Sequence, residues 1–232
     1  MIKLVVVKFG GSAIGPDGAD IPEIVKRIND LKKNSKVIAV FSAPLTMHNG
    51  KMCSLTDVIL EQGRNAESGI NPSLDIVKST YQKILEMINS DNKEDCRKTI
   101  DLHLEKVQKA LDEAFVNKEF ADEIRSRALA FSGEILMSHV MNYVLRSDGI
   151  KTDAVGFDDW PIITDNNIES TNFLITESKE KMGKTAKLVE ENEVVAIGGF
   201  IGKTVDNVTT TYERGGSDRT AADLGILFHK KY

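Results

Sequence analysis

The stretch LVVVKFGGSAIG, residues Leu4 to Gly15, decides how this 232-residue chain is expected to fold. Its apolar run predicts a buried strand, and that strand leads into Lys8, the pair Gly10–Gly11 and Ser12. The lysine and glycines have two interpretations. One is a lysine that snorkels to solvent before an ordinary turn, which is the simpler interpretation for this stretch alone. The other is a set of backbone amides and one ammonium gathered around an anion.

The composition indicates a globular chain without a nucleic-acid or membrane surface. Apolar residues make up 41% of the chain, which allows a substantial core, and the net charge of −5 argues against a basic nucleic-acid stripe. No apolar run approaches the roughly 20 residues that span a bilayer, and the N-terminus lacks the features of a signal peptide. Cys53 and Cys96 lie far apart, and the four histidines are scattered. We therefore expect a cytoplasmic protein with no intrinsic metal site.

Short apolar runs alternate with helical stretches, which is typical of an α/β fold with a mainly parallel sheet. The predicted strands cover residues 3–9, 36–43, 151–157 and 193–202. A helix is predicted over residues 21–33, with Asp20 as its N-cap.

The middle of the chain, from about residue 73 to 149, predicts only amphipathic helices. Apolar residues at helical spacing form two stripes: Leu74, Val77, Tyr81, Ile84, Leu85 and Ile88, then Ile100, Leu104, Val107, Leu111 and Phe115. A polar break is expected over residues 89–96. We interpret the stripes as packing surfaces of an inserted helical region that serves as a lid or a dimerisation layer.

Three clusters of chemically useful residues follow predicted strands or open helices, at the edge where open α/β sheets bind ligands. The first is Lys8 to Ser12. The second is FSGEIL, where Glu134 is either a helix N-terminal charge that the dipole stabilises or a receptor for a substrate ammonium. The residues alone leave both interpretations of Glu134 open.

The third cluster is GGFIGKTVDNVTTTYERGGSD, residues Gly198 to Asp218. A hairpin is expected through Asp206 and Asn207. Arg214 offers a planar fork that suits a carboxylate, and Ser217 or Asp218 could cap the helix that follows. Capping explains one of these residues, but it does not explain an arginine and two glycines beside it.

Together the clusters favour phosphoryl transfer. They hold cations, glycines and carboxylates but no Ser-His-Asp set, no metal-ligand pair and no GxGxxG. Phosphoryl transfer depends mainly on positioning and charge stabilisation, which such residues can supply.

The motifs VVKFGGSAIG, VFSA, SLTDVIL, FSGEIL, GGFIG and TTTYERGGSD resemble, in order and spacing, those of the amino acid kinase family, and most closely aspartate kinases. The usual aspartate kinase patterns are KFGGTS, VVSA, VTN, SFGE, GFIG and TTLGRGGSD. The resemblance covers nearly the whole chain. It implies a three-layer, carbamate kinase-like sandwich and ATP-dependent phosphorylation of the side-chain carboxylate of L-aspartate, with Mg²⁺ bound through the nucleotide phosphates.

The resemblance also implies roles for individual residues. Lys8, Gly10, Gly11 and Ser12 would bind the phosphates, and Asp218 would orient Lys8. Glu134 would hold the substrate ammonium and Arg214 its α-carboxylate. The remaining residues expected in the substrate pocket are Ser42, Thr56, Phe200 and Ser217.

The chain also departs from the pattern. Glu213 stands where the pattern has glycine, which leaves substrate choice open, Ser12 replaces threonine, and the loop from Pro44 to Ser54 is longer than expected. The 232 residues include no nucleotide-binding half or regulatory region after the RGGSD helix, so we expect residues 1–232 to be a fragment, the substrate-binding lobe of such a kinase, inactive alone and pairing with a second chain. A natural short protein that has lost catalysis is the other interpretation. The alternatives are a kinase of the same superfamily with another acceptor, and a non-catalytic binding or assembly module.

Overall fold

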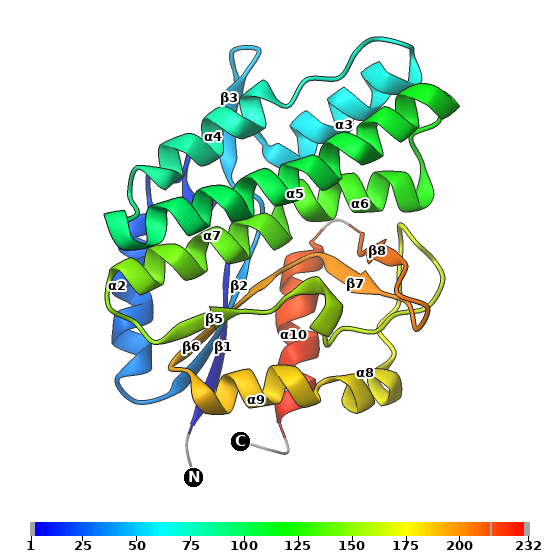
Figure 1. Ribbon diagram of the computed structural model, residues 1–232. Helices are drawn as coiled ribbons and strands as arrows, with labels where there is room; N and C mark the ends of the chain where they lie inside the picture. The colour runs from blue at the N-terminus through cyan, green and yellow to red at the C-terminus, as the bar shows by residue number, and fades with distance from the viewer. Residues whose placement is uncertain (1–2, 214, 230–232) are drawn as a thin grey trace.

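A computed structural model of the chain describes residues 3–213 and 215–229. Its centre is a four-stranded sheet in the order β1 (Leu4–Phe9), β2 (Lys36–Phe41), β6 (Val194–Gly198) and β5 (Thr152–Ala154) (Figure 1). Every neighbouring pair in this sheet is parallel. The predicted α/β class with a parallel central sheet is therefore confirmed.

Helices cover both faces of the sheet. The connection from β1 to β2 contains α1 (Gly11–Ile14) and α2 (Ile21–Lys32), and that from β5 to β6 contains α8 (Ile175–Lys181) and α9 (Gly183–Glu191). These crossovers run in opposite directions along the sheet, so right-handed connections place α2 and α9 on opposite faces. The last helix, α10 (Gly216–Phe228), packs against β1, β2 and α8. The result is the expected three-layer arrangement.

The middle of the chain is helical, as predicted. Its helices are α3 (Leu55–Glu67), α4 (Asp75–Leu85), α5 (Ser90–Asn117), α6 (Asp122–Ser132) and α7 (Glu134–Ser147), and residues 55–147, all described, contain no strand. Both predicted stripes are buried, with Phe115 packed at the margin. The layer nearest the sheet is α7, with α5 and α6 stacked on it.

Two details of the helix prediction were wrong. The polar stretch 89–96 is not a break, because α5 already begins at Ser90 and the Asn89 side chain caps it by accepting a hydrogen bond from the Asn92 amide at 3.2 Å. Asp20 stands at the N-cap position of α2, but its side chain makes no capping hydrogen bond.

The predicted strand 193–202 is two strands. After β6, Phe200 adopts a left-handed backbone with φ of 67°, which turns the chain out of the sheet. There β7 (Ile201–Lys203) pairs antiparallel with β8 (Thr209–Thr211) through the expected turn at Asp206 and Asn207. A second hairpin joins β3 (Leu45–His48) to β4 (Lys51–Ser54), and η1 (Phe157–Asp159) follows β5.

The strand register sets the position of the site. Phe9 is opposite Phe41, and Phe41 is opposite Gly198, so three neighbouring strands end side by side. The loops after β1, β2 and β6 therefore emerge together at one edge of the sheet.

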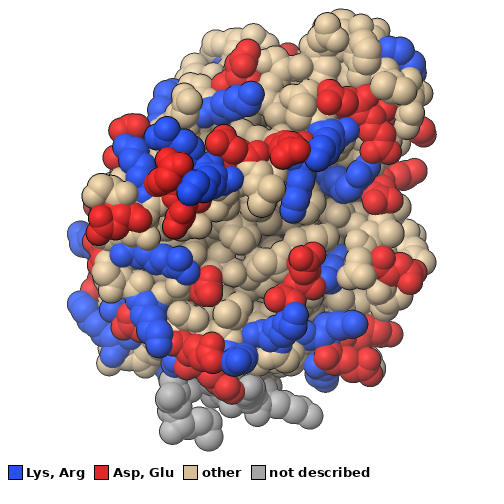
Figure 2. Space-filling view, viewed as in Figure 1, with Lys and Arg blue, Asp and Glu red and all other residues tan. Residues whose placement is uncertain are grey.

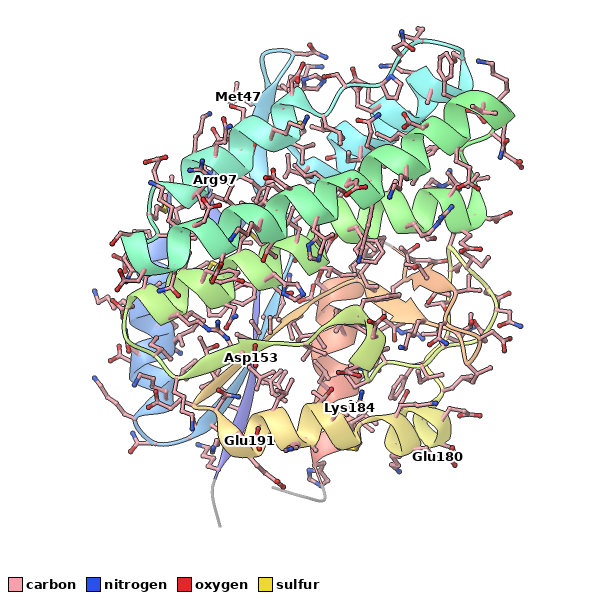
Figure 3. The ribbon with its side chains drawn as sticks, viewed as in Figure 1. Met47, Arg97, Asp153, Glu180, Lys184 and Glu191 are labelled. Atoms are coloured by element: carbon pink, nitrogen blue, oxygen red, sulfur yellow. The ribbon has the colours of Figure 1, made fainter. Side chains whose placement is uncertain are left out.

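The outer surface carries mixed charge. Figure 2 shows acidic and basic side chains interspersed on one face, and Figure 3 shows Lys184 and Glu191 projecting from α9. Within residues 3–213 and 215–229, no helix has the length and apolarity needed to cross a membrane.

Candidate active site

A cleft of about 780 Å³ opens at the carboxyl edge of the sheet. It brings together most of the residues predicted for the site: Lys8, Gly11, Ser12, Ser42, Thr56, Glu134, Phe200, Ser217 and Asp218. Gly10 does not line the cleft but lies directly behind Lys8, since a Cβ atom there would be 3.1 Å from Lys8 Nζ. Arg214 lies outside the described residues.

One end of the cleft holds an ion pair between β1 and α10. Lys8 Nζ lies 3.2 Å from both carboxylate oxygens of Asp218. The Lys8 side chain is 27% exposed and that of Asp218 is 72% exposed. A lysine near the end of a half-buried strand thus lines the cleft, with its ammonium beside Gly10.

Gly198 and Gly199 let the end of β6 pack closely against the starts of α7 and α10. A Cβ atom on Gly198 would lie 2.8 Å from the Glu134 backbone, and one on Gly199 would lie 2.6 Å from the Ser217 side chain. Contacts this short exclude any side chain, so the end of β6 can approach the starts of α7 and α10 only because both residues are glycine.

Ser217 and Asp218 do not cap α10, which corrects one sequence interpretation. The helix begins at Gly216, its N-cap position is Gly215, and no side chain caps it. Both residues lie in the first turn, with Ser217 buried and Asp218 exposed. Their side chains are free to face the cleft, where Asp218 meets Lys8.

The other notable group is Glu134, a carboxylate buried where α6 passes into α7. Its side chain is only 5% exposed, and its Oε2 atom has no hydrogen-bond partner. Burial raises the pKa of Glu134 to about 7, against a smaller opposite effect from its own amide and that of Ala43. A buried carboxylate with a free oxygen in a cleft is well suited to receive a cation.

Tyr81 supports the position of Glu134. The Tyr81 hydroxyl, fully buried in α4, donates to the carbonyl oxygens of Ser132 at 2.8 Å and Gly133 at 3.1 Å. These two carbonyls form the corner between α6 and α7. Sequence reasoning assigned Tyr81 to a packing stripe, and periodicity alone gives no signal for this second role.

The loops after β2 and β4 supply another side of the cleft. The Ser42 amide donates to the Phe9 carbonyl at 3.0 Å, which fixes Ser42 beside the end of β1. Thr56 lies in the first turn of α3, whose start is fixed by a reciprocal capping box between Ser54 and Asp57. Sequence reasoning did not use that box, although its Ser-x-x-Asp spacing was a readable signal.

Sequence reasoning missed a further wall of the cleft. Arg125 and Glu169 both line it and form an ion pair, and the Ser170 hydroxyl donates to Glu213 at 2.6 Å. Arg125 and Glu169 are 44 positions apart in the chain. No local pattern reports a contact of that separation.

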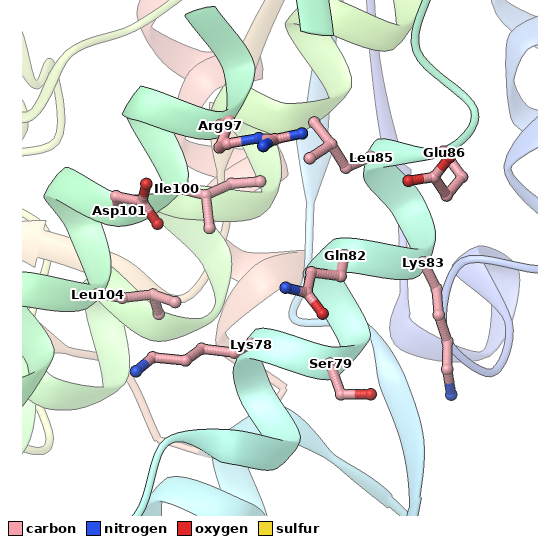
Figure 4. Close-up of a pocket in the computed structure, with 10 residues that line it drawn as sticks. All are labelled: Lys78, Ser79, Gln82, Lys83, Leu85, Glu86, Arg97, Ile100, Asp101 and Leu104. Carbon is pink, nitrogen blue, oxygen red and sulfur yellow. The ribbon is translucent and has the colours of Figure 1, made fainter. Parts of the chain in front are cut away.

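A second cavity, of about 430 Å³, lies between α4 and α5 (Figure 4). Leu85, Ile100 and Leu104 contribute apolar surface to it, with charged side chains such as Lys78 and Arg97 around them. It contains none of the residues that the sequence motifs single out. The cleft at the sheet edge is therefore the candidate active site.

The geometry suits transfer of an anionic group to a small charged acceptor. Lys8 can offset negative charge in the cleft, and the free oxygen of Glu134 can hold a cation in the same cleft. Positioning and charge stabilisation of this kind are what phosphoryl transfer requires.

Comparison with known proteins identifies the family of the chain. The model of the amino acid kinase family matches residues 3–231. The chain is 25% identical over 97% of its length to the bifunctional aspartokinase/homoserine dehydrogenase 2, chloroplastic, of Arabidopsis thaliana, and covers 24% of that protein. It is 33% identical over 43% of its length to aspartokinase 1 of Bacillus subtilis, again covering 24% of that protein.

Solved structures show the same fold. Aspartokinase III of E. coli, in complex with aspartate and ADP, matches 98% of this chain with a TM-score of 0.75 at 20% identity. Aspartate kinase of Clostridium acetobutylicum matches 98% with a TM-score of 0.69 at 24% identity. The chain spans slightly under half of each of these structures and about a quarter of the curated relatives. Because the family model matches almost the entire length, this chain belongs to the amino acid kinase family.

Proposed function

We propose that the protein is an aspartate kinase, which transfers the γ-phosphoryl group of ATP to the side-chain carboxylate of L-aspartate and forms 4-phospho-L-aspartate. The observation that carries the proposal is that one cleft contains both Lys8 and Glu134. Glu134 is buried, and its Oε2 atom has no hydrogen-bond partner. The aspartokinase relatives support the same acceptor. The reaction would serve amino-acid biosynthesis, at the entry to lysine, threonine and methionine.

At the phosphate end, Lys8 offsets the charge that develops during transfer, and Asp218 holds its ammonium at 3.2 Å. Gly11 and Ser12 line the same end and leave room for the phosphoryl group, with Gly10 behind the lysine. ATP is the co-substrate, and Mg²⁺ enters with its phosphates. ADP in the E. coli aspartokinase III complex supports nucleotide use.

At the acceptor end, Glu134 binds the substrate ammonium. A cation beside the free Oε2 atom offsets the cost of burying the carboxylate charge, so substrate binding favours ionised Glu134. Ser217, Phe200, Ser42 and Thr56 surround the acceptor. Binding of the α-carboxylate by Arg214 remains a prediction from its sequence motif.

The test is an assay in which ADP formation and acyl phosphate are measured together, with hydroxylamine used to trap the acyl phosphate as a hydroxamate. We expect ADP formation that depends on aspartate, with one hydroxamate for each ADP. ADP formation with another acceptor would indicate a different kinase of the family. Aspartate binding without any ATP turnover would indicate a binding module.

A further inference from the structure

Tyr212, which follows β8, is a buried residue to which the proposed reaction gives no role. Its side chain is 1% exposed, and its hydroxyl donates to the carboxylate of Asp223 in α10 at 2.6 Å. Asp223 is itself only 6% exposed. Burial raises the pKa of Tyr212, so the hydroxyl keeps its proton and donates. A short hydrogen bond to a carboxylate fixes the direction of the contact as well as its length.

Tyr212 lies along one face of α10. A Cβ atom on Gly216 would be 2.6 Å from Tyr212 Cβ, the Arg219 guanidinium lies 4.9 Å from the centre of the Tyr212 ring, and the hydroxyl reaches Asp223. Gly216, Arg219 and Asp223 are spaced as i, i+3 and i+7, which places them on one face of a helix. A single side chain therefore contacts the first two turns of α10.

The backbone of Tyr212 is held on its other side. Its amide donates to the Phe200 carbonyl at 2.9 Å, at the point where the chain turns after β6. The Phe200 ring also packs on the start of α10, since its Cδ2 atom would lie 2.7 Å from a Cβ atom on Gly216. Tyr212 thus connects the end of β6 to α10, through its backbone on one side and its side chain on the other.

Asp218 projects from a different face of α10. It is two residues from Gly216 and five from Asp223, and at about 100° per residue neither separation returns to the same face. This face meets Lys8, whose ammonium lies 3.2 Å from the Asp218 carboxylate. A rotation of α10 about its own axis would therefore carry Asp218 away from Lys8. The hydrogen bond between Tyr212 and Asp223 opposes that rotation because it is directional.

We propose that Tyr212 is a positioning residue, which sets the rotation of α10 through Asp223 and so holds Asp218 in contact with Lys8. Tyr212 lines the cleft, but its hydroxyl is engaged by Asp223. It acts on the reaction through Asp218. The value of this contact for phosphoryl transfer rests on the proposed function.

The experiment measures how fast acetic anhydride acetylates Lys8, with the modified lysines counted by mass spectrometry. An ammonium beside a carboxylate gives up its proton less readily, so the Lys8–Asp218 contact slows the reaction. We expect Tyr212→Phe to raise the rate at Lys8 a few-fold and Asp218→Asn to raise it at least as much. Adding Tyr212→Phe to Asp218→Asn should give no further rise, because Tyr212 acts through Asp218.

The steady-state kinetics should follow the same pattern. Tyr212→Phe should lower kcat a few-fold and leave the KM for aspartate at the parent value, because it disturbs the Lys8–Asp218 contact and no group assigned to aspartate binding. In the Asp218→Asn background it should lower kcat no further.

Two controls are matched to this experiment. Lys184 of α9 is 2.6 Å from Asp159, and its acetylation rate should be the same in every variant (Figure 3). Tyr143→Phe removes another tyrosine hydroxyl, which lies 3.1 Å from the Thr99 hydroxyl. Neither Tyr143 nor Thr99 lines the cleft, so the rate at Lys8 should stay at the parent value.

A further variant separates positioning from stability. Tyr212→Phe leaves the buried Asp223 carboxylate without its donor, which lowers Tm. Combining Tyr212→Phe with Asp223→Leu removes both partners, so most of the Tm should return. The fast acetylation of Lys8 and the lowered kcat should persist, because an apolar contact does not fix direction. If Tyr212→Phe fails to fold, this double variant is measured in its place.

Acetylation of Lys8 at the parent rate in the folded variants would overturn the inference, and so would a return of that rate to the parent value together with Tm. Either result leaves the proposed function intact. A parent protein that does not phosphorylate aspartate would overturn the proposed function, while the acetylation rates would still test whether Tyr212 positions Asp218.

Discussion

Lys8 and Glu134, which both line the cleft, differ in burial and in pairing. Lys8 is partly exposed and already paired with Asp218, whereas Glu134 is buried and keeps one oxygen without a partner. A screened surface pair contributes little to folding, while an unpaired buried carboxylate opposes it. Under the proposed function, Lys8 would serve charge that appears during the reaction. Glu134 would serve charge that arrives with the substrate.

The largest effect is expected at the Lys8 end. Lys8→Ala should lower kcat on the order of 10² to 10³-fold, as loss of one charge-stabilising group commonly does. The KM for aspartate should change little, because the charge is needed chiefly in the transition state. Steady-state kinetics of the folded variant tests this. A kcat within a few-fold of the parent would remove Lys8 from the mechanism.

A smaller loss, now in binding, is expected at the Glu134 end. Glu134→Gln should weaken aspartate binding roughly 10- to 100-fold, because a charge-assisted contact contributes about 1.5 to 3 kcal/mol. Calorimetric titration of aspartate gives the affinity. An affinity equal to that of the parent would show that the substrate ammonium binds elsewhere.

The same substitution should raise stability above neutral pH. The pKa of Glu134 is about 7 in the fold against an ordinary 4.5, so this group's contribution to stability is present below pH 4.5 and is lost as pH rises through 7. We expect Glu134→Gln to have a higher Tm than the parent at pH 8 and a similar Tm near pH 4.5. Thermal denaturation at the two pH values checks it, and a lower Tm at pH 8 would contradict the burial argument.

The smallest effect is expected from Asp218→Asn. This carboxylate is 72% exposed, so its loss should leave Tm almost unchanged. Because an amide still accepts a hydrogen bond from Lys8, kcat should fall only a few-fold. A large fall in Tm would make Asp218 a structural residue of α10.

Much of this arrangement was predictable from the sequence, for a physical reason. Apolar runs and helical spacing report burial directly, so the four strands of the sheet and the helical middle were predicted. Their bounds were predicted less well, since the strand expected over 151–157 is only Thr152–Ala154 and the one expected over 193–202 is two strands. Glycines and charged residues after strands mark the sheet edge, which is why Lys8, Gly11 and Asp218 were predicted to lie near one another. Register then brings the three strand ends together.

The features that the sequence did not predict depend on a backbone turn and on contacts between residues far apart in the chain. The turn at Phe200 needs a left-handed non-glycine residue, which strand periodicity does not predict. The Tyr81 hydroxyl reaches carbonyls about fifty positions away, and Arg125 reaches Glu169. These contacts arise only after the helices have packed. For that reason the sequence predicted the groups expected to bind the ligand and missed those that hold them in place.

The central claim is that aspartate places its ammonium beside Glu134, and proton release tests it most directly. Burial raises the pKa of Glu134 to about 7, so part of the free protein carries a protonated Glu134 at pH 7. Aspartate should therefore release a fraction of a proton on binding at pH 7 and a smaller fraction at pH 8.5. Calorimetry in two buffers of different ionisation enthalpy measures this number. Glu134→Gln should release none at either pH, and a parent protein that binds aspartate at pH 7 without proton release would contradict the account.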